Sequence, residues 1–236
     1  MSADAIALQD ILFRWHRRSA PVLDIPAFRV EAGERVFLEG PSGSGKTTLL
    51  GLLGGISVPE RGSLRVLGRD LPALSAAQRD AFRAEHVGVI FQMFNLLPYL
   101  SLVDNVLLPC RFSRKRRARA LAGAGSLEAA ALRLLEHMEL DTDRLAGRPV
   151  ARLSVGQQQR VAAARALIGA PLLVIADEPT SALDASARAR FLDLLFRETT
   201  AAGAALLFVS HDAALQPHFD RALSLAEINR AEHGEP

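Results

Sequence analysis

The sequence predicts an α/β fold, and three observations lead to that expectation. Short apolar segments typical of strands alternate along the chain with segments typical of helices. A glycine-rich turn joins one of these strands to a helix, and another strand, at 172–176, ends in Asp177 and Glu178. Because ligands bind at the carboxyl ends of strands in open α/β sheets, functional carboxylates are expected at this last position.

The composition is that of a globular protein of 236 residues, with 49% hydrophobic and 23% charged residues. The single cysteine, Cys110, excludes a disulfide scaffold and a cysteine-based metal site. No apolar run approaches the ~18 residues that span a bilayer, and the first residues show no signal-peptide pattern, so we expect a cytosolic chain. The net charge of +2 is small, and we expect no nucleic-acid partner.

The chain is expected to form one domain, residues 1–236, whose first half begins with alternating elements. Strands are predicted at 6–15, 35–39, 63–67 and 87–91. A helix at 46–53 should end at Gly54 and Gly55, and a second helix, capped by Ser75, should follow the third strand.

From Ser101 to about 148 the strand signals disappear, which predicts an inserted α-helical subdomain at about 95–160. Gly123 and Gly125 should separate at least two helices there, and an apolar stripe at helical spacing follows them, formed by Leu127, Ala131, Leu134, Leu135 and Met138. Beyond it we expect a helix at 156–168, a buried strand at 172–176 and a helix capped by Asp184 that ends near Thr199. A buried strand at 205–209, an edge strand at 221–226 and a frayed tail from Glu227 complete the chain.

The most informative motif is the glycine-rich turn, which fits the phosphate-binding pattern G-x-x-x-x-G-K-[ST] between a strand and a helix. Glycines let successive backbone N–H groups face phosphates, and the helix N-terminus attracts anions. Lys46 would supply a positive charge to the outer phosphates, and the Thr47 hydroxyl could bind magnesium. The loop residues expected to bind the nucleotide are Gly40, Pro41, Ser42, Gly43, Ser44, Gly45, Lys46, Thr47 and Thr48.

The second motif is the apolar strand that ends in two carboxylates. We expect Asp177 to hold magnesium, and Glu178 to orient or deprotonate the attacking water. A glycosidase pair is disfavoured, because neighbouring carboxylates at a strand end do not flank a sugar bond. The glycine-rich turn does not fit a serine-hydrolase elbow either, since Ser44 stands at the wrong position.

Several motifs together resemble the ATP-binding subunits of ABC transporters. Residues 153–160, L-S-V-G-Q-Q-Q-R, resemble the family signature L-S-G-G-Q, and the resemblance extends from about Ile6 to Ala226. Further motifs match in the family's order: Gln92 the Q-loop, residues 181–184 the D-loop, and His211 the switch histidine. Trp15 stands where the family places an aromatic that stacks on adenine.

The resemblance implies a phosphate-loop NTPase fold with a RecA-like core, an antiparallel β lobe and an inserted helical subdomain. It also implies an ATPase that uses ATP and Mg²⁺. Glu178, His211, Lys46 and Gln92 would act in catalysis, and Thr47, Gln92 and Asp177 would bind the metal.

The signature also suggests a composite site. Ser154 and Gly156 stand at the start of a helix and would form a second anion-binding terminus, although one nucleotide needs only one cradle. The resemblance implies two copies facing head to tail, with Ser154, Gly156, Gln157 and Asp184 completing the partner's ATP site. Val155, where the family usually has glycine, departs from the pattern and narrows the allowed backbone angles.

Single residues also have simpler interpretations. A tryptophan at a strand end often only packs, and a lone histidine after a strand is often a core or surface residue; the same alternative applies to Gln92. The basic run at 111–119 is expected to be a solvated helical face or loop, with contact to anionic lipid headgroups as the alternative. The apolar segment 91–98 could be core, or could line a groove for a helix of a membrane partner.

The resemblance is greatest to the lipoprotein-release, macrolide-export and cell-division subgroup. It implies an ATPase subunit at the cytoplasmic face of the inner membrane that drives a separate permease. The alternative is a regulatory ATPase of the cell-division type that switches a membrane partner. A DNA-repair ATPase is disfavoured, because the chain has no long coiled-coil or zinc insertion between the motifs.

Overall fold

The computed structural model describes residues 4–41 and 43–231. The chain divides into two compact units, one formed by residues up to 83 together with those from 205, the other by residues 84–204. The helices of the described residues include none with the length and hydropathy of a membrane-spanning segment.

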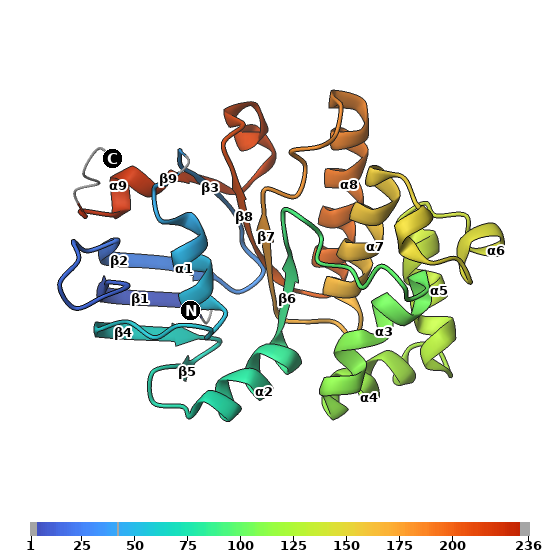
Figure 1. The fold of residues 1–236 in the computed structure, drawn as a ribbon, viewed down its shortest axis with the longest axis horizontal. Helices are drawn as coiled ribbons and strands as arrows, with labels where there is room; N and C mark the ends of the chain where they lie inside the picture. Colours follow the sequence, from blue (N-terminus) through green and yellow to red (C-terminus); the bar gives the residue numbers. More distant parts are fainter. Residues whose placement is uncertain (1–3, 42, 232–236) are drawn as a thin grey trace. The chain divides into compact units, whose positions relative to one another are not determined.

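The first unit contains an antiparallel sheet with the strand order β2-β1-β4-β5. Its β1–β2 pair has the register Leu8↔Phe28, and both side chains are buried. Figure 1 shows β2, β1 and β4 side by side. The four strands are β1 (Asp4–Phe13), β2 (Leu23–Glu31), β4 (Arg61–Val66) and β5 (Arg69–Asp70).

Parallel strands form the rest of this unit's core, because β8 and β9 both pair with β3. Phe37 of β3 stacks on Phe208 of β8 with 6.2 Å between ring centroids, and the strand that leads to the glycine-rich turn is therefore buried on its neighbours. These elements are β3 (Arg35–Glu39), α1 (Lys46–Leu53), β8 (Ala205–Ser210), the 3₁₀ turn η2 (Ala213–His218), β9 (Arg221–Ser224) and α9 (Leu225–Ile228).

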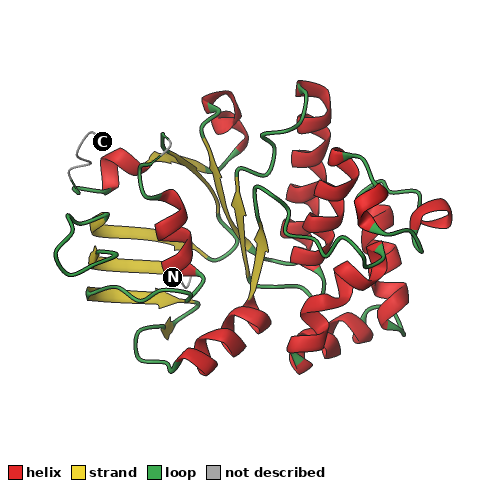
Figure 2. Ribbon diagram, viewed as in Figure 1, coloured by secondary structure: helices red, strands yellow, loops and turns green. Residues whose placement is uncertain are grey.

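Helices make up most of the second unit (Figure 2). Its two strands, β6 (Val87–Ile90) and β7 (Leu173–Asp177), pair in parallel, and α2 (Ala76–His86) leads into β6. The signature helix α7 packs against β6, α3, α5 and α8. The helices are α3 (Leu102–Phe112), α4 (Arg114–Ala122), α5 (Leu127–His137), α6 (Thr142–Leu145), η1 (Val150–Arg152), α7 (Val155–Leu167) and α8 (Ala185–Ala201).

Side-chain caps explain where these helices begin. A serine or aspartate at each N-cap accepts a backbone N–H of the first turn, which satisfies one of the unpaired donors there. The caps are Ser101, Ser113, Ser126, Asp141, Ser154 and Asp184 for α3 to α8. The predicted capping of α2 by Ser75 and of α8 by Asp184 is confirmed, as is the break between α4 and α5 at the glycines.

Three predictions about the first unit are wrong. The strand predicted at 221–226 ends at Ser224, because α9 begins at Leu225. The first strand ends at Phe13, so Trp15 lies beyond it. The chain is ordered beyond Glu227, which was predicted to begin a frayed tail. Glu227 lies in α9, and the buried Asn229 binds the backbone of β2 and of the residue before it. The Asn229 side chain accepts the Asp24 N–H at 2.8 Å and donates to the Val22 carbonyl at 3.0 Å.

The basic run at 111–119 is helical, but it is not uniformly solvated as predicted. Arg116 is only 2% exposed and donates to the carbonyls of Ile168, Ala166 and Val87. Burial lowers its pKa to about 10. Two of the acceptors lie at the C-terminus of α7, where carbonyls lack partners within the helix, so the guanidinium satisfies groups that would otherwise be buried and unpaired.

Candidate functional site

The glycine-rich turn connects β3 to α1 in a conformation that requires its glycines. Gly43 and Gly45 have φ values of 82° and 95°, in the left-handed region that other residues rarely adopt. A Cβ atom on Gly40 would stand 2.7 Å from the Ser44 hydroxyl oxygen. The turn therefore exposes backbone where side chains would otherwise stand.

The N-terminus of α1 has the features of an anion-binding site. Its N-cap, Gly45, provides no side-chain cap, and the first turn contains no acidic residue. The buried Ser44 hydroxyl has no hydrogen-bond partner among the described residues. A buried polar group without a partner is costly, and a phosphate oxygen at this helix terminus would satisfy both the hydroxyl and the free N–H groups. The residues present thus fit a phosphate chain; Ser42 lies outside the described residues.

The Lys46 side chain forms hydrogen bonds with the backbone of its own loop. Its ammonium donates to the carbonyl of Gly40 and, at 2.9 Å, to that of Pro41. Thr47 is exposed, whereas Thr48 is 8% exposed and faces the core. Phosphate binding to Lys46 would exchange two neutral acceptors for charged ones, which form stronger bonds.

Two further predicted residues lie in the same unit as this loop. Trp15 is 60% exposed, and its ring meets Phe13 edge to face at 5.0 Å, so one neighbour steadies an otherwise open indole. His211 directly follows β8 and is exposed. Both could take part in binding a ligand from the solvent side.

The acidic pair lies in the second unit, at the carboxyl end of β7. Asp177 is the last residue of the strand, and Glu178 is 8% exposed with φ 46°. A non-glycine residue in the left-handed region is unusual, and such residues cluster at functional sites. The Gln159 amide of α7 donates to the carbonyl of Pro179, which helps to hold this turn.

The signature motif begins α7 with a reciprocal cap. The Ser154 hydroxyl accepts the Gln157 N–H at 3.3 Å, and the Gln157 side chain accepts the Ser154 N–H at 3.0 Å. Val155 is the first helical residue, half exposed, and it does not prevent the cap. Gly156 would accept a Cβ at ordinary contact distance from Leu183. Because the Ser154 hydroxyl accepts in this cap, its own proton stays available to a ligand.

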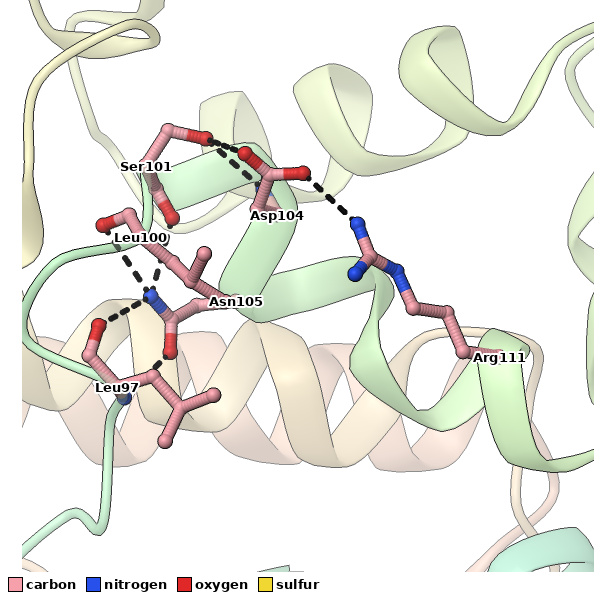
Figure 3. A network of polar contacts seen from close by, with 6 residues as sticks. All are labelled: Leu97, Leu100, Ser101, Asp104, Asn105 and Arg111. Atoms are coloured by element: carbon pink, nitrogen blue, oxygen red, sulfur yellow. Dashed lines mark hydrogen bonds and ion pairs between the residues drawn. The ribbon is translucent and has the colours of Figure 1, made fainter.

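Gln92 is exposed and stands two residues after β6. Farther along, the buried Asn105 of α3 holds the loop by accepting the Leu97 N–H at 2.8 Å and donating to the carbonyls of Leu97, Leu100 and Ser101 (Figure 3). Met93 and Tyr99 are 81% and 73% exposed. The segment after Gln92 is therefore a braced loop with apolar side chains on its surface.

Asp184 has a structural role that the geometry explains. Its carboxylate accepts the Ala187 N–H at 2.8 Å and the Ser186 hydroxyl at 2.9 Å. These bonds, first the one from the Ala187 backbone, lower the pKa of Asp184. Its predicted contribution to nucleotide binding stays a prediction.

Comparisons with known proteins give the family. The sequence profile described as "ABC transporter" matches residues 23–181. The chain belongs to the ABC transporter family. It is 39% identical, over 89% of its length and 88% of the relative's, to the lipoprotein-releasing system ATP-binding protein LolD of Syntrophotalea carbinolica. It is 40% identical, over 88% of its length, to the macrolide export ATP-binding/permease protein MacB of Rhodopirellula baltica, but spans 29% of that longer protein.

Solved ABC structures agree with the fold. The dimeric structure of MJ0796, a bacterial ABC transporter cassette, matches with a TM-score of 0.78 and 30% identity, over 98% of this chain and 99% of that one. A second dimeric structure of MJ0796, in a post-hydrolysis state bound to ADP and Pi, matches with a TM-score of 0.77 and 31% identity, over 93% of both chains. The predicted fold class, family and ATPase activity are confirmed: this chain is an ATP-binding and ATP-hydrolysing ABC transporter subunit.

Within this ABC ATPase, the predicted residues fall into two groups. The phosphate loop, Trp15 and His211 belong to the first unit, and the remaining predicted site residues, from Gln92 to Asp184, belong to the second. The motifs identified these residues, but they did not show the side chains that hold them, such as Gln159. The partners of those side chains lie far away in the sequence, and the only local signal is that Gln159 falls on the buried face of α7.

Proposed function

We propose that two copies of this ABC ATPase bind two ATP molecules with Mg²⁺ between them, each copy completing the other's site. The observation that carries the proposal is the N-terminus of α1, with its left-handed glycines, its missing cap and the unpartnered Ser44 hydroxyl. The exposed Ser154 at the start of α7 offers a second place where a phosphate could be bound, this time from a partner copy. The solved MJ0796 relatives are dimers, which supports this assembly.

Each residue has a defined task in this proposal. Lys46 and the loop N–H groups bind the phosphates, and Trp15 stacks on the base. Glu178 accepts a proton from the attacking water, and His211 contacts the terminal phosphate. Glu178 is 8% exposed, and this burial limits the orientations open to its carboxylate, which favours a single orientation of that water.

The metal site is part of the same proposal. Thr47, Gln92 and Asp177 offer a hydroxyl, an amide and a carboxylate oxygen, the donor type that Mg²⁺ prefers. When bound, the ion would neutralise charge that develops on the phosphates.

The transporter is proposed to be of the lipoprotein-release or macrolide-export kind, with the permease on a separate chain at the membrane. The relatives named LolD and MacB support this choice. Met93 and Tyr99 present apolar surface just after Gln92, where a permease helix could dock. The subunit would then work at the cytoplasmic face of the membrane.

ATPase measurements with and without the permease test the proposal. The purified chain should hydrolyse ATP only with Mg²⁺ present, and co-reconstitution with the permease in lipid nanodiscs should change its rate. The Glu178→Gln variant in the same nanodiscs measures the background. No Mg²⁺-dependent hydrolysis would contradict the ATP site, and a rate unaffected by the permease would contradict the proposed partner.

A further inference from the structure

Arg165 of the signature helix binds the loop that follows Gln92. Its guanidinium donates to the carbonyl of Asn95 at 2.6 Å and to that of Phe94 at 2.5 Å. Arg165 is half-buried, and burial lowers its pKa, although an arginine stays protonated at neutral pH. A permanently charged fork thus connects the last turn of α7 to a loop about seventy positions earlier in the chain.

The conformation of the loop explains why a planar fork suits it. Phe94 and Asn95 have φ values of 58° and 48°, so two successive non-glycine residues are left-handed. Such a pair is unfavourable unless other contacts hold it, particularly at an aromatic residue. Their two carbonyls are both reached by the same guanidinium, whose adjacent N–H groups have a fixed geometry. The bonds therefore favour a loop conformation that its own residues do not prefer.

The other end of β6 is also connected to α7 by arginines. Arg116 donates to the carbonyl of Val87 and to carbonyls at the end of α7, and Arg119 donates to Glu85 and Gly169, both at 2.7 Å. Arginine side chains thus connect the backbone at the start of β6, and the loop after the end of β6, to the C-terminal end of α7. In the sequence, Gln92 lies between the end of β6 and the two residues whose carbonyls Arg165 binds.

We propose that Arg165 is a positioning residue, which fixes Gln92 relative to the signature helix, whose N-cap is Ser154. The inference rests on the proposed function, in which Gln92 binds the metal and faces the permease. Arg165 itself touches neither nucleotide nor metal; it acts through the loop. Loss of its two bonds should leave the ATP-binding loop intact and misplace Gln92.

Steady-state ATPase kinetics of Arg165→Gln and Arg119→Gln provide the test. Arg119 is the matched control, because its guanidinium also makes two bonds to backbone carbonyls in the same unit but none beside Gln92. We expect Arg165→Gln to lower kcat about 10-fold with KM for ATP within about 2-fold, since small misplacements of reacting groups are costly. Arg119→Gln should keep kcat within about 2-fold of the wild type. Equal kcat values for the two variants would overturn the proposal.

Two further measurements separate positioning from general loss of structure. Arg165→Lys keeps the charge and a donor, and it should recover part of the lost kcat. Hydrogen–deuterium exchange without nucleotide should show faster exchange of residues 92–97 in Arg165→Gln but not in Arg119→Gln. Exchange of the α7 backbone should be unchanged in both variants. Unchanged exchange in that segment would overturn the proposal even if both variants lost activity. If the wild type proves inactive, the proposed function fails, while the exchange result still decides the role of Arg165.

Discussion

The side-chain amide of Gln159 in α7 donates a hydrogen bond to the backbone carbonyl of Pro179, the residue that follows Glu178. Gln159 is 1% exposed, so this bond is shielded from water. Glu178 itself has φ 46°, a conformation that costs about 1–2 kcal/mol for a residue with a side chain. The signature helix therefore helps to hold the proposed general base in its unfavourable backbone conformation.

The first prediction concerns that base. Glu178→Gln should bind ATP with wild-type affinity and lower kcat at least about 100-fold, because an amide does not accept the proton of water. Glu139→Gln is the control, since Glu139 is exposed and has a similar φ of 56°. Phosphate release under saturating ATP measures kcat. A Glu178→Gln variant within 10-fold of the wild-type rate would exclude Glu178 as the base.

The second prediction concerns the phosphate loop. Lys46→Ala should weaken ATP binding at least about 10-fold, because a hydrogen bond to a charged group contributes about 1.5–3 kcal/mol. Lys115→Ala removes the other lysine, which is exposed and pairs with Glu85 at 2.9 Å, and should leave affinity unchanged. Titration of a fluorescent ATP analogue compares the two. Equal affinities would show that Lys46 does not bind the phosphates.

The third prediction concerns the signature serine. Ser154→Arg should leave ATP binding by one copy intact and abolish ATP-driven association, because a bulky cation would stand where the partner's phosphate is expected. Ser126→Arg is the control, since the Ser126 side chain also accepts a backbone N–H as the N-cap of α5, and either substitution removes one such bond. Light scattering with ATP compares their association. Hydrolysis by Ser154→Arg at the wild-type rate would contradict a shared site.

The fourth prediction concerns stability. Asn105→Ala should lower the free energy of unfolding by about 2–3 kcal/mol, because the fully buried side chain accepts the Leu97 N–H, which would lose its partner, and also donates to the Leu97 carbonyl. Arg111→Ala removes an exposed ion pair with Asp104 in the same network and should cost less than about 1 kcal/mol. Urea unfolding measures both. Similar losses would mean that Asn105 does not brace the loop after Gln92.

The sequence patterns located most strands and helices, but they missed β2. Its run of apolar residues contains Pro26, which is unfavourable in a central strand. In the structure β2 is an edge strand of its sheet, where a proline is tolerated. Whether this segment could form a strand therefore depended on its place at the edge of the sheet. That place is set by pairing with other segments of the chain and cannot be read from the segment itself. The same reason applies to Asn229, whose partners lie more than 200 residues earlier.

The functional motifs were predictable because they are local. The phosphate loop, the acidic pair and the signature each fall within a few consecutive residues. The buried side chains that hold the surrounding backbone were not predictable, since Arg116, Gln159 and Arg165 bind carbonyls 20 to 71 positions away. An arginine run on a helix usually indicates a solvated face. Arg116 differs from the other arginines of the run only in lying four positions before Ala120, on the buried face of α4.

Sedimentation of the Glu178→Gln variant with ATP and Mg²⁺ measures the sharing of sites between copies most directly. Two subunits of 25.5 kDa should sediment together, with one nucleotide per chain, and addition of Ser154→Arg to the same chain should return it to a single subunit. A particle of one subunit at saturating ATP, together with full hydrolysis by a wild-type monomer, would contradict the account.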